Sequence, residues 1–225
     1  THLLDIDKFD AAFNHALAYS RKKMVIIEEQ ISLAGYQVAG DGFVVDGKLT
    51  FRCWADEHFD KLCNGLVPIG QTFPSSCSND LLEIAHNETQ RLLTLLGMKI
   101  GALNFDFVFT ETGEFYFLEL GPRNGGCLIP EVIRYSTGVD LIKFTVDAAL
   151  GLPIDTLKMT STNGYWSSYM VHSLEAGEFE KLWISERAKT KIVEQDIWVN
   201  PGDPIEKYLG ANNTYGTMIL KFNSM

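Results

Sequence analysis

The chain has 225 residues, of which 46% are hydrophobic and 21% are charged, and it carries a formal net charge of −10. This composition indicates a globular protein with ample core, and the acidic excess argues against nucleic acid as a partner. No apolar run approaches the ~18 residues of a membrane span, and no secretory signal opens the chain. We therefore expect a cytoplasmic protein that does not partner with a membrane.

The first predicted elements are a helix and a strand. Apolar residues at helical spacing predict an amphipathic helix over residues 7–21, and Asp5 or Asp7 can cap its N-terminus. The apolar run over residues 24–31 predicts a buried strand.

A hairpin, an irregular connection and a long helix follow. Residues 42–51 predict a hairpin, because Asp46-Gly47 is a typical two-residue turn between apolar strands. Prolines and glycines predict a long irregular connection over residues 65–74. Serine and asparagine caps at 76–79 predict a helix that runs to about Leu96, where a glycine follows as a stop signal.

Two aromatic strands around single carboxylates form the most informative stretch of the chain. Residues 110–113 predict the turn of a hairpin between these strands. Because side chains alternate along a strand, Asp106 lies on one face with Asn104, and the hairpin can bring Asp106 and Glu119 together. Two like charges in an apolar sheet need a cation between them, and oxygen ligands suit Mg²⁺. An alternative is that both residues lie on the solvated face of an ordinary hairpin.

The segment directly after this hairpin strengthens the case for a phosphate site. Arg123 is a permanently charged fork that suits phosphate, and the glycine pair 125–126 lets the backbone approach a ligand closely. The glycine turn can also present amides to an anion at the helix that follows. Together with a metal, these features suggest phosphoryl transfer.

The last third of the chain changes from helical to strand patterns. Two helices are predicted over residues 128–136 and 139–150. His172 is a candidate site residue, although a packed or surface histidine is the commoner case. The four cysteines show no Cys-x-x-Cys pairing and no nearby histidine at zinc spacing, so we expect reduced thiols. Strands are predicted over residues 165–172, 179–184, 191–199 and 216–222.

The stretch that begins at Glu119 resembles a known family signature. Glu119-Leu120-Gly121-Pro122-Arg123-Asn124-Gly125-Gly126 is similar to the Glu-x-Asn-Pro-Arg-x-Gly-Gly signature of the ATP-grasp superfamily. The resemblance implies that Asp106 and Glu119 bind Mg²⁺, with Mn²⁺ as an alternative, and that Arg123 contacts the transferred phosphate or the acyl phosphate. Gly121 stands where the family usually has a metal-binding Asn, so the number of metal ions stays open.

The resemblance also assigns residues to the nucleotide. Residues 24–31 are similar to the hinge strand of the family, in which the Glu29 carbonyl and the Ile31 amide would bind adenine and Glu28 would lie beside the base. Gln37 replaces the glutamate that binds the ribose hydroxyls, and its amide can still hydrogen-bond a ribose hydroxyl. Two asparagines are the nearest polar neighbours of the metal pair. Asn104 is assigned to the cofactor, and Asn124 is assigned to catalysis.

The fold class implied is α+β, with the C-terminal subdomain of an ATP-grasp module, an antiparallel sheet flanked by helices, followed by a small β-rich region. We expect residues 1–30 to end the small subdomain, residues 31–153 to form the large subdomain with the metal and phosphate site, and residues 154–225 to form the β-rich region. No glycine precedes Gly35, so the glycine-rich phosphate loop of the family is missing, and so is its lysine. We expect a fragment that by itself binds nucleotide weakly and turns over no ATP.

The resemblance implies an ATP-dependent ligase that activates a carboxylate as an acyl phosphate and couples it to an amine or a similar nucleophile. The expected cofactors are ATP and Mg²⁺, the expected partners are the small-molecule carboxylate and nucleophile, and a homodimer is an expected assembly. Two alternatives stay open. One is phosphorylation of bicarbonate, as in carbamoyl phosphate synthase or biotin carboxylase, and the other is a degenerate nucleotide-binding scaffold without catalysis.

Overall fold

The computed structural model describes residue 3 and residues 5–224, which form two compact units: residues 1–32 and residues 33–225. The first unit contains a short 3-10 helix, Ile6–Lys8, and α1, Phe9–Tyr19. Asp5 caps the 3-10 helix, because its carboxylate accepts a hydrogen bond from the Asp7 amide at 3.1 Å. The helix predicted from the amphipathic pattern is therefore confirmed.

The strand predicted over residues 24–31 is wrong for this structure. These residues have no regular secondary structure, and Met24, Ile26 and Ile27 are exposed. A strand needs a neighbour for its backbone hydrogen bonds, and none of the described strands pairs with this stretch. An apolar pattern does not show whether a strand has a neighbour to pair with.

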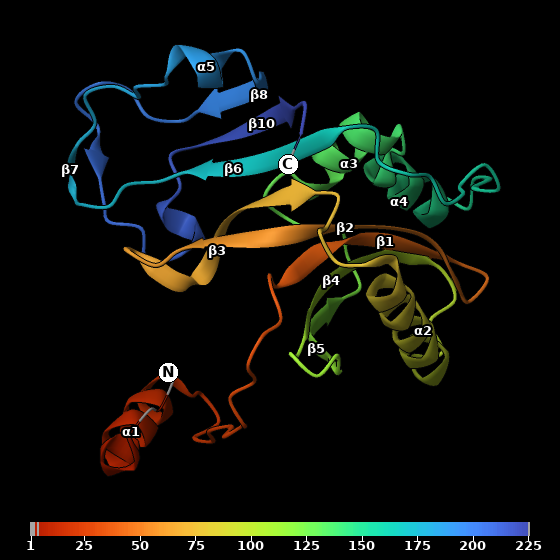
Figure 1. Cartoon of the computed structure of the whole chain (residues 1–225), viewed down its shortest axis with the longest axis horizontal. Helices are drawn as coiled ribbons and strands as arrows, with labels where there is room; N and C mark the ends of the chain where they lie inside the picture. The colour runs from red at the N-terminus through yellow and green to blue at the C-terminus, as the bar shows by residue number, and fades with distance from the viewer. Residues whose placement is uncertain (1–2, 4, 225) are drawn as a thin grey trace. The chain divides into compact units, whose positions relative to one another are not determined.

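The second unit is built on one antiparallel sheet of eight strands in the order β5-β4-β1-β2-β3-β6-β10-β8 (Figure 1). Its N-terminal half is made by two hairpins and one further strand. The turn between β1 and β2 has Asp46 at φ 50° and Gly47 at φ 78°, which confirms the predicted Asp-Gly turn. The strand bounds are β1 Val38–Val45, β2 Lys48–Asp60, β3 Asn64–Phe73, β4 Gly101–Phe109 and β5 Phe115–Gly121.

Strand β3 occupies the stretch that the sequence predicted as an irregular connection. Pro68 lies opposite Phe59 where the β2–β3 register shifts, and such irregularities accommodate a proline that cannot donate to the ladder. Gly70 lies where β3 meets β6, and a Cβ at this position would lie 2.3 Å from the Ser168 carbonyl oxygen. Here the glycine permits close strand approach and does not end the strand.

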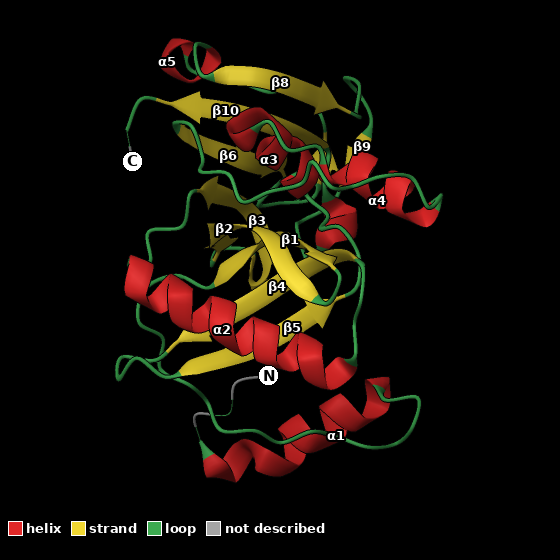
Figure 2. Ribbon diagram, turned by 90° about the vertical axis from the view of Figure 1, so that its right-hand side faces the viewer, coloured by secondary structure: helices red, strands yellow, loops and turns green. Residues whose placement is uncertain are grey.

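Helices cover both faces of the sheet. Helix α2, Asn79–Leu96, begins at Ser78, whose hydroxyl accepts from the Leu81 amide, and ends at Gly97 with φ 66°, so its predicted caps are confirmed. In Figure 2 it lies in front of β4 and β5, and its buried residues belong to one apolar cluster with residues of β1, β2 and β4. Helices α3, Ile129–Thr137, and α4, Leu141–Ala149, also match their predictions and pack on the opposite face. None of the helices in the described part of the chain is long and apolar enough to cross a membrane.

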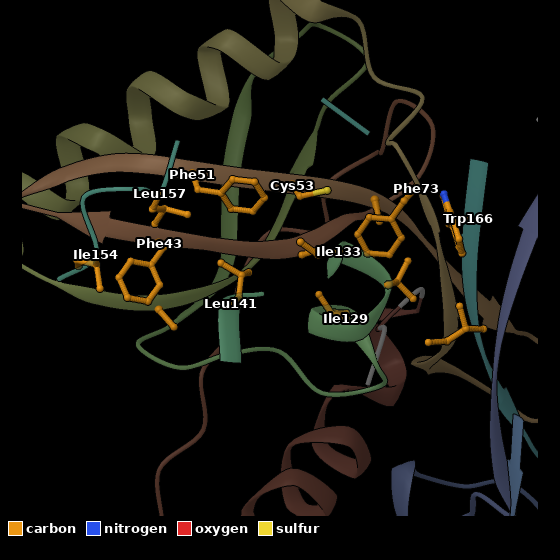
Figure 3. Close-up of a cluster of buried hydrophobic side chains, with 14 residues drawn as sticks. Phe43, Phe51, Cys53, Phe73, Ile129, Ile133, Leu141, Ile154, Leu157 and Trp166 are labelled. Atoms are coloured by element: carbon orange, nitrogen blue, oxygen red, sulfur yellow. The ribbon is translucent and has the colours of Figure 1, made fainter. Parts of the chain in front are cut away.

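Each face of the sheet has its own apolar core. On the α2 face, Leu93 packs with Trp54, Phe105 and Phe107. On the α3 and α4 face, Ile133 and Leu141 pack on alternate residues of the same strands (Figure 3). The second core also includes the residues Phe43, Phe51, Cys53, Phe73, Ile129, Ile154, Leu157, Trp166 and Ile219. Both faces of the central strands are therefore buried.

The C-terminal strands extend the same sheet. Strands β6, Tyr165–Val171, β8, Ile192–Ile197, and β10, Gly216–Phe222, match three predicted strands. The strand predicted over residues 179–184 is wrong, because only Gly177–Glu178 pairs, as β7 with β9, Pro204–Ile205. A four-residue helix, α5, Glu186–Lys189, precedes β8. The β-rich C-terminal stretch is thus joined to the central strands by the pairing of β3 with β6. The division into three domains at residues 30 and 153 stays a prediction.

Candidate functional site

The carboxylates of the two aromatic strands face each other. In the β4–β5 register, Asp106 lies directly opposite Glu119, so the pairing predicted from side-chain alternation is confirmed. The turn between the strands closes with the Thr110 amide donating to the Glu114 carbonyl at 2.9 Å and with Gly113 at φ 82°. The hairpin thus places two acidic groups side by side.

Asp106 is half-buried in an acidic environment. Burial raises its pKa to about 7, and repulsion from Glu57 and then from Glu119 adds to the rise, while Arg123 opposes it. A divalent cation bound beside this carboxyl group would favour its ionised form, because the cation supplies positive charge that the site lacks. The donor set around Asp106 therefore fits a hard cation, while its role as a metal ligand stays a prediction.

Arg123 is the cation that the structure places at this pair. Its Nη2 donates to Glu119 Oε1 at 3.2 Å, and its Nη1 donates to Asn104 Oδ1 at 3.2 Å and to the Asn124 carbonyl at 3.0 Å. The Arg123 side chain is 55% exposed. It is therefore anchored at the pair and still accessible to a ligand.

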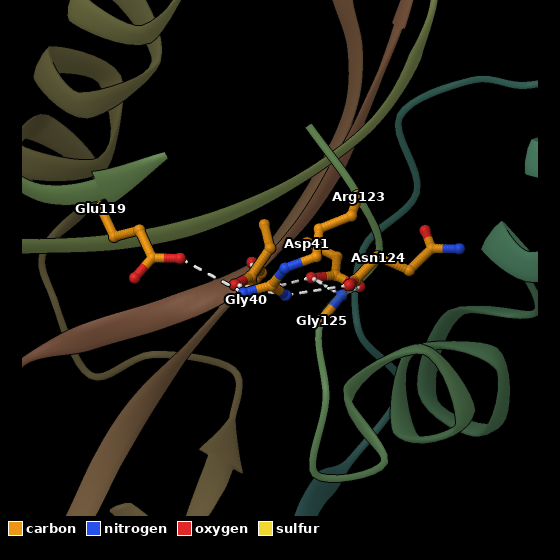
Figure 4. Close-up of polar contacts among 7 residues, drawn as sticks. Gly40, Asp41, Glu119, Arg123, Asn124 and Gly125 are labelled. Atoms are coloured by element: carbon orange, nitrogen blue, oxygen red, sulfur yellow. Dashed lines mark hydrogen bonds and ion pairs between the residues drawn. The ribbon is translucent and has the colours of Figure 1, made fainter. Parts of the chain in front are cut away.

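A buried aspartate holds the turn that follows Arg123. Asp41 is fully buried in β1, and both its oxygens accept from the Gly125 amide, at 2.9 and 2.8 Å, while Oδ1 also accepts from Asn104 Nδ2 at 3.0 Å (Figure 4). Burial raises the pKa of Asp41 to about 7, and the Gly125 and Asn104 hydrogen bonds oppose that rise. The sequence analysis missed Asp41, although an aspartate between two glycines inside an apolar strand was a visible signal.

One amide of the glycine turn that was predicted to face an anion is already occupied. The Gly125 amide serves Asp41, so this amide is not the one offered to an anion. Two successive residues after it, Cys127 and Leu128, have φ 54° and 62°, a left-handed conformation that non-glycine residues seldom adopt. Such strain persists where the surroundings enforce it, and it clusters at ligand sites.

A second buried carboxylate, Glu57, was also missed. Its Oε2 accepts from Gln37 Nε2 at 2.7 Å and its Oε1 accepts from Gln71 Nε2 at 3.2 Å. Ser168 donates in turn to Gln71, so a polar row crosses β2, β3 and β6. Burial raises the pKa of Glu57. Strand β2 carries several other charged residues, so its sequence did not single out Glu57.

The residues predicted to bind nucleotide are placed unequally. Asn104 donates to Asp41, and Gln37 donates to Glu57. Glu28 and Glu29 are exposed and Ile31 is half-buried in the other unit, which is described by itself. Their roles stay predictions.

Asn124 and Gly121 of the signature have different surroundings. Asn124 is directed away from Glu119, as Figure 4 shows, and its Nδ2 donates to Thr145 of α4 at 3.0 Å. This contact gives Asn124 a structural partner, and its catalytic role stays a prediction. Gly121 is paired with Asn104, and a Cβ there would meet Arg123 Cγ at an ordinary 3.5 Å.

A cavity of about 390 Å³ lies on the C-terminal half of the sheet. It is lined by Cys127 of the strained turn, by Glu194 and Asp196 of β8, and by the aromatic residues Trp198 and Tyr208. Two carboxylates and two aromatic rings form a lining that suits a positively charged ligand.

No family model matches the chain. It is 30% identical over 178 residues to the carbamoyl phosphate synthase large chain of Thermoanaerobacter sp. (strain X514), a match that covers 76% of this chain and 16% of that protein. It is also 28% identical over 136 residues to an uncharacterised protein, y4rH, of Sinorhizobium fredii (strain NBRC 101917 / NGR234). This match covers 60% of this chain and 28% of that protein. The chain therefore spans only a minor part of the length of either relative.

Solved structures share the fold over nearly the whole chain. Phosphoribosylglycinamide synthetase from Anaerococcus prevotii matches with a TM-score of 0.73 and 21% identity, over 98% of this chain and 56% of that chain. L-amino acid ligase from Bacillus licheniformis matches with a TM-score of 0.71 and 17% identity, over 85% and 48% of the two chains. The biotin carboxylase domain of Hydrogenobacter thermophilus 2-oxoglutarate carboxylase, solved with MgADP, ADP and bicarbonate, matches with a TM-score of 0.71 and 17% identity, over 97% and 48%. The chain therefore has the fold of the ATP-grasp superfamily, which its sequence also resembles around Glu119 and Arg123.

Proposed function

We propose that the chain is part of an ATP-dependent ligase, which activates a carboxylate as an acyl phosphate with ATP and Mg²⁺ and couples it to an amine. The observation that carries this proposal is the pair formed by Asp106 and Glu119, with Arg123 bonded to Glu119. Phosphoryl transfer depends on positioning and on charge neutralisation, and these three residues supply both.

The carboxylates and the arginine have different roles in this proposal. Asp106 and Glu119 would hold Mg²⁺, which when bound neutralises phosphate charge. Arg123, which is 55% exposed, would contact the phosphate. Asp41 keeps the following turn in place through Gly125, so that Arg123 stays close to the carboxylates.

The nucleotide contacts are proposed from the family resemblance and from the network. Gln37 and Asn104 are the proposed contacts in the sheet unit, and both are oriented by buried carboxylates. Glu28, Glu29 and Ile31 are the proposed adenine contacts. A nucleotide titration of the full-length protein with Gln37→Ala and with Glu28→Ala tests the two groups separately, and unchanged affinity in both would contradict the assignment.

The acidic cavity favours an amine as the nucleophile. Its lining by Glu194 and Asp196 would attract an ammonium group and repel bicarbonate, which is an anion. L-amino acid ligase is among the proteins that share the fold, and a biotin carboxylase domain solved with bicarbonate is another, so the fold alone does not choose between them. The charge of this cavity is the reason to place the amine first.

A scaffold without catalysis remains the second alternative. Gly121 and Gln37 favour it, because each replaces a residue that usually contacts metal or nucleotide in the family. Asp106, Glu119 and Arg123 argue against it, since a scaffold has no use for a triad of charges held this close.

Release of ADP by the full-length protein tests the proposal, measured across panels of amino acids, other amines and bicarbonate. We expect Mg²⁺-dependent ADP release that needs both a carboxylate and an amine, and its loss in Asp106→Asn and in Glu119→Gln. Glu111→Gln, an exposed carboxylate in the turn of the same hairpin, is the matched control and should keep full activity. Near wild-type turnover in either site variant would remove the metal assignment at that position, and turnover with bicarbonate alone would select the first alternative.

The oligomeric state and the cellular location of the protein are also proposed. We propose a cytoplasmic protein that forms a homodimer, because a biotin carboxylase domain of the same fold was solved as a dimer. Sedimentation at several concentrations tests the assembly, and a monomer throughout would contradict it.

A further inference from the structure

A histidine, a cysteine and an aspartate that are far apart in the sequence meet beside the β2–β3 hairpin. Asp60 ends β2, Cys63 lies in the turn before β3, and His172 directly follows β6. One potential ligand atom of each lies within 4.8 Å of the other two. None of these residues belongs to the carboxylate pair or to the acidic cavity.

Each ring nitrogen of His172 has its own partner. Its Nδ1 lies 2.8 Å from the Met170 carbonyl and its Nε2 lies 3.1 Å from Asp60 Oδ2. With Nδ1 as the donor to the backbone carbonyl, which is the usual outer contact of a histidine ligand, Nε2 is the nitrogen that faces Asp60 and is the one available to a cation.

The aspartate and the cysteine are held in the positions that a shared ion requires. Oδ1 of Asp60 accepts from the Leu62 amide at 2.8 Å, which orients the carboxylate and directs Oδ2 to the cluster. Cys63 is a free, half-buried thiol whose Sγ donates to the Ser173 carbonyl at 3.6 Å. The three groups therefore converge from two separate backbone segments, each fixed by its own backbone contact.

The cluster is largely shielded from solvent. The side chain of His172 is 6% exposed and that of Asp60 is 19% exposed. The rings of Tyr169 and Tyr208 flank the imidazole, with centroids at 5.9 and 5.0 Å. A divalent ion at this place would bond all three groups at once.

We propose that Asp60, Cys63 and His172 bind a zinc-type divalent ion, with water at the fourth position. The donor set of nitrogen, sulfur and oxygen is typical of Zn²⁺ and is poorly suited to Mg²⁺, which takes oxygen ligands. The ion ties the β2–β3 hairpin to the end of β6. Because it binds only where the two segments have come together, it stabilises the folded state.

Cobalt is the probe that separates this site from the carboxylate pair. The reduced, chelator-treated chain is titrated with Co²⁺ in excess Mg²⁺, and absorbance is recorded. We expect a thiolate-to-cobalt charge-transfer band in the near ultraviolet and the visible bands of four-coordinate cobalt, both removed by added Zn²⁺. Absence of the charge-transfer band in the wild-type chain overturns the proposal.

Variants assign the ligands. Cys63→Ser should abolish the charge-transfer band, and Asp60→Asn and His172→Gln should each weaken Co²⁺ binding by more than the ~10–100-fold that loss of an outer-shell contact costs. Cys77→Ser, a half-buried cysteine outside the cluster, is the matched control and should keep the band. An unchanged band in Cys63→Ser, or its loss in Cys77→Ser, overturns the assignment.

A thermal measurement guards against variants that fold poorly. Zn²⁺ should raise the melting temperature of the wild-type and Cys77→Ser chains and should leave that of Asp60→Asn unchanged. The same rise in Asp60→Asn as in wild type would overturn the proposal, whatever the spectra of the cysteine variants.

Discussion

Four carboxylates lie on neighbouring strands of the sheet, and each is accommodated in a different way. Asp41 accepts from backbone and side-chain amides, Glu57 accepts from two glutamine amides, and Glu119 is paired with Arg123. The pKa of Asp106 is raised to about 7, as is that of Asp41, but for Asp106 the neighbouring carboxylates Glu57 and Glu119 add to the effect of burial. At the residue scale, an added cation at Asp106 would therefore relieve repulsion from two neighbours.

The pKa of Asp106 predicts how the metal-free protein responds to pH. The folded value of about 7 lies above the ~3.9 of an unfolded aspartate, so the folded state binds more protons between these values. The contribution of Asp106 to stability is therefore fully present at low pH and is lost as the pH rises through about 7. Asp106→Asn should raise the melting temperature more at about pH 8 than at about pH 5.

The measurement is a thermal melt in chelator at both pH values. Asp41 shares the raised pKa, so part of the pH dependence should remain in the Asp106 variant. An equal gain at both pH values would show that Asp106 is ionised throughout.

Gly121 tests the departure from the family signature. Its φ is not in the left-handed region, and a Cβ would meet Arg123 at ordinary contact distances, so the backbone accepts a side chain here. Gly121→Asn in the full-length protein should tighten Mg²⁺ binding by about 1 kcal/mol, the scale of one added hydrogen bond or ligand. Activity titrated against Mg²⁺ measures this. Gly121→Ala separates the backbone effect from the ligand, and weaker Mg²⁺ binding in the Asn variant with Ala unchanged would mean that residue 121 does not face the metal.

At the scale of elements, β3 connects the two halves of the sheet. It pairs with β2 on one side and with β6 on the other. The polar row from Glu57 through Gln71 to Ser168 crosses both of these pairings. The position of β6, and of the cavity beyond it, thus depends on how closely β3 and β6 approach.

Gly70→Ala should weaken that approach. The added Cβ would lie 2.3 Å from the Ser168 carbonyl oxygen, which belongs to the backbone of a central strand. We expect a loss of about 1–3 kcal/mol, the usual cost of overpacking, measured by denaturant unfolding. Gly177→Ala is the control, because nothing lies within 4 Å of its Cβ, and it should stay within about 0.5 kcal/mol of wild type. Equal stability of the two variants would contradict the close β3–β6 contact.

At the scale of the molecule, the two apolar cores belong entirely to the unit of residues 33–225. The core on the α3 and α4 face draws on the C-terminal strands through Trp166 and Ile219. The β-rich stretch predicted to begin at residue 154 is therefore part of the same apolar core as the strands of the carboxylate pair.

This arrangement predicts the outcome of two truncations. A chain of residues 33–225 should unfold cooperatively with a melting temperature close to that of residues 1–225, because both cores are retained. A chain of residues 33–164 should lose cooperative unfolding, since it exposes the edge of β3 and opens one core. Calorimetry of the three chains decides the matter, and a cooperative transition in residues 33–164 would show that the C-terminal stretch is a separate domain.

Local patterns in the sequence determined the elements whose signals lie within a few residues. The hairpin with Asp106 and Glu119, the caps of α2 and the turn at Asp46-Gly47 were all predicted, because turns and caps depend on neighbours close in the chain. The family signature that begins at Glu119 was likewise a local string, and it led to the ATP-grasp fold.

Tertiary structure alone decided what depends on distant partners. Residues 24–31 have a strand pattern without a paired neighbour, whereas β3 forms despite Pro68 because β2 and β6 hold it on both sides. Asp41 meets Gly125, 84 residues away, and Asp60 meets His172, 112 residues away. No spacing rule covers such separations, because the folded sheet, and not the chain, sets these distances.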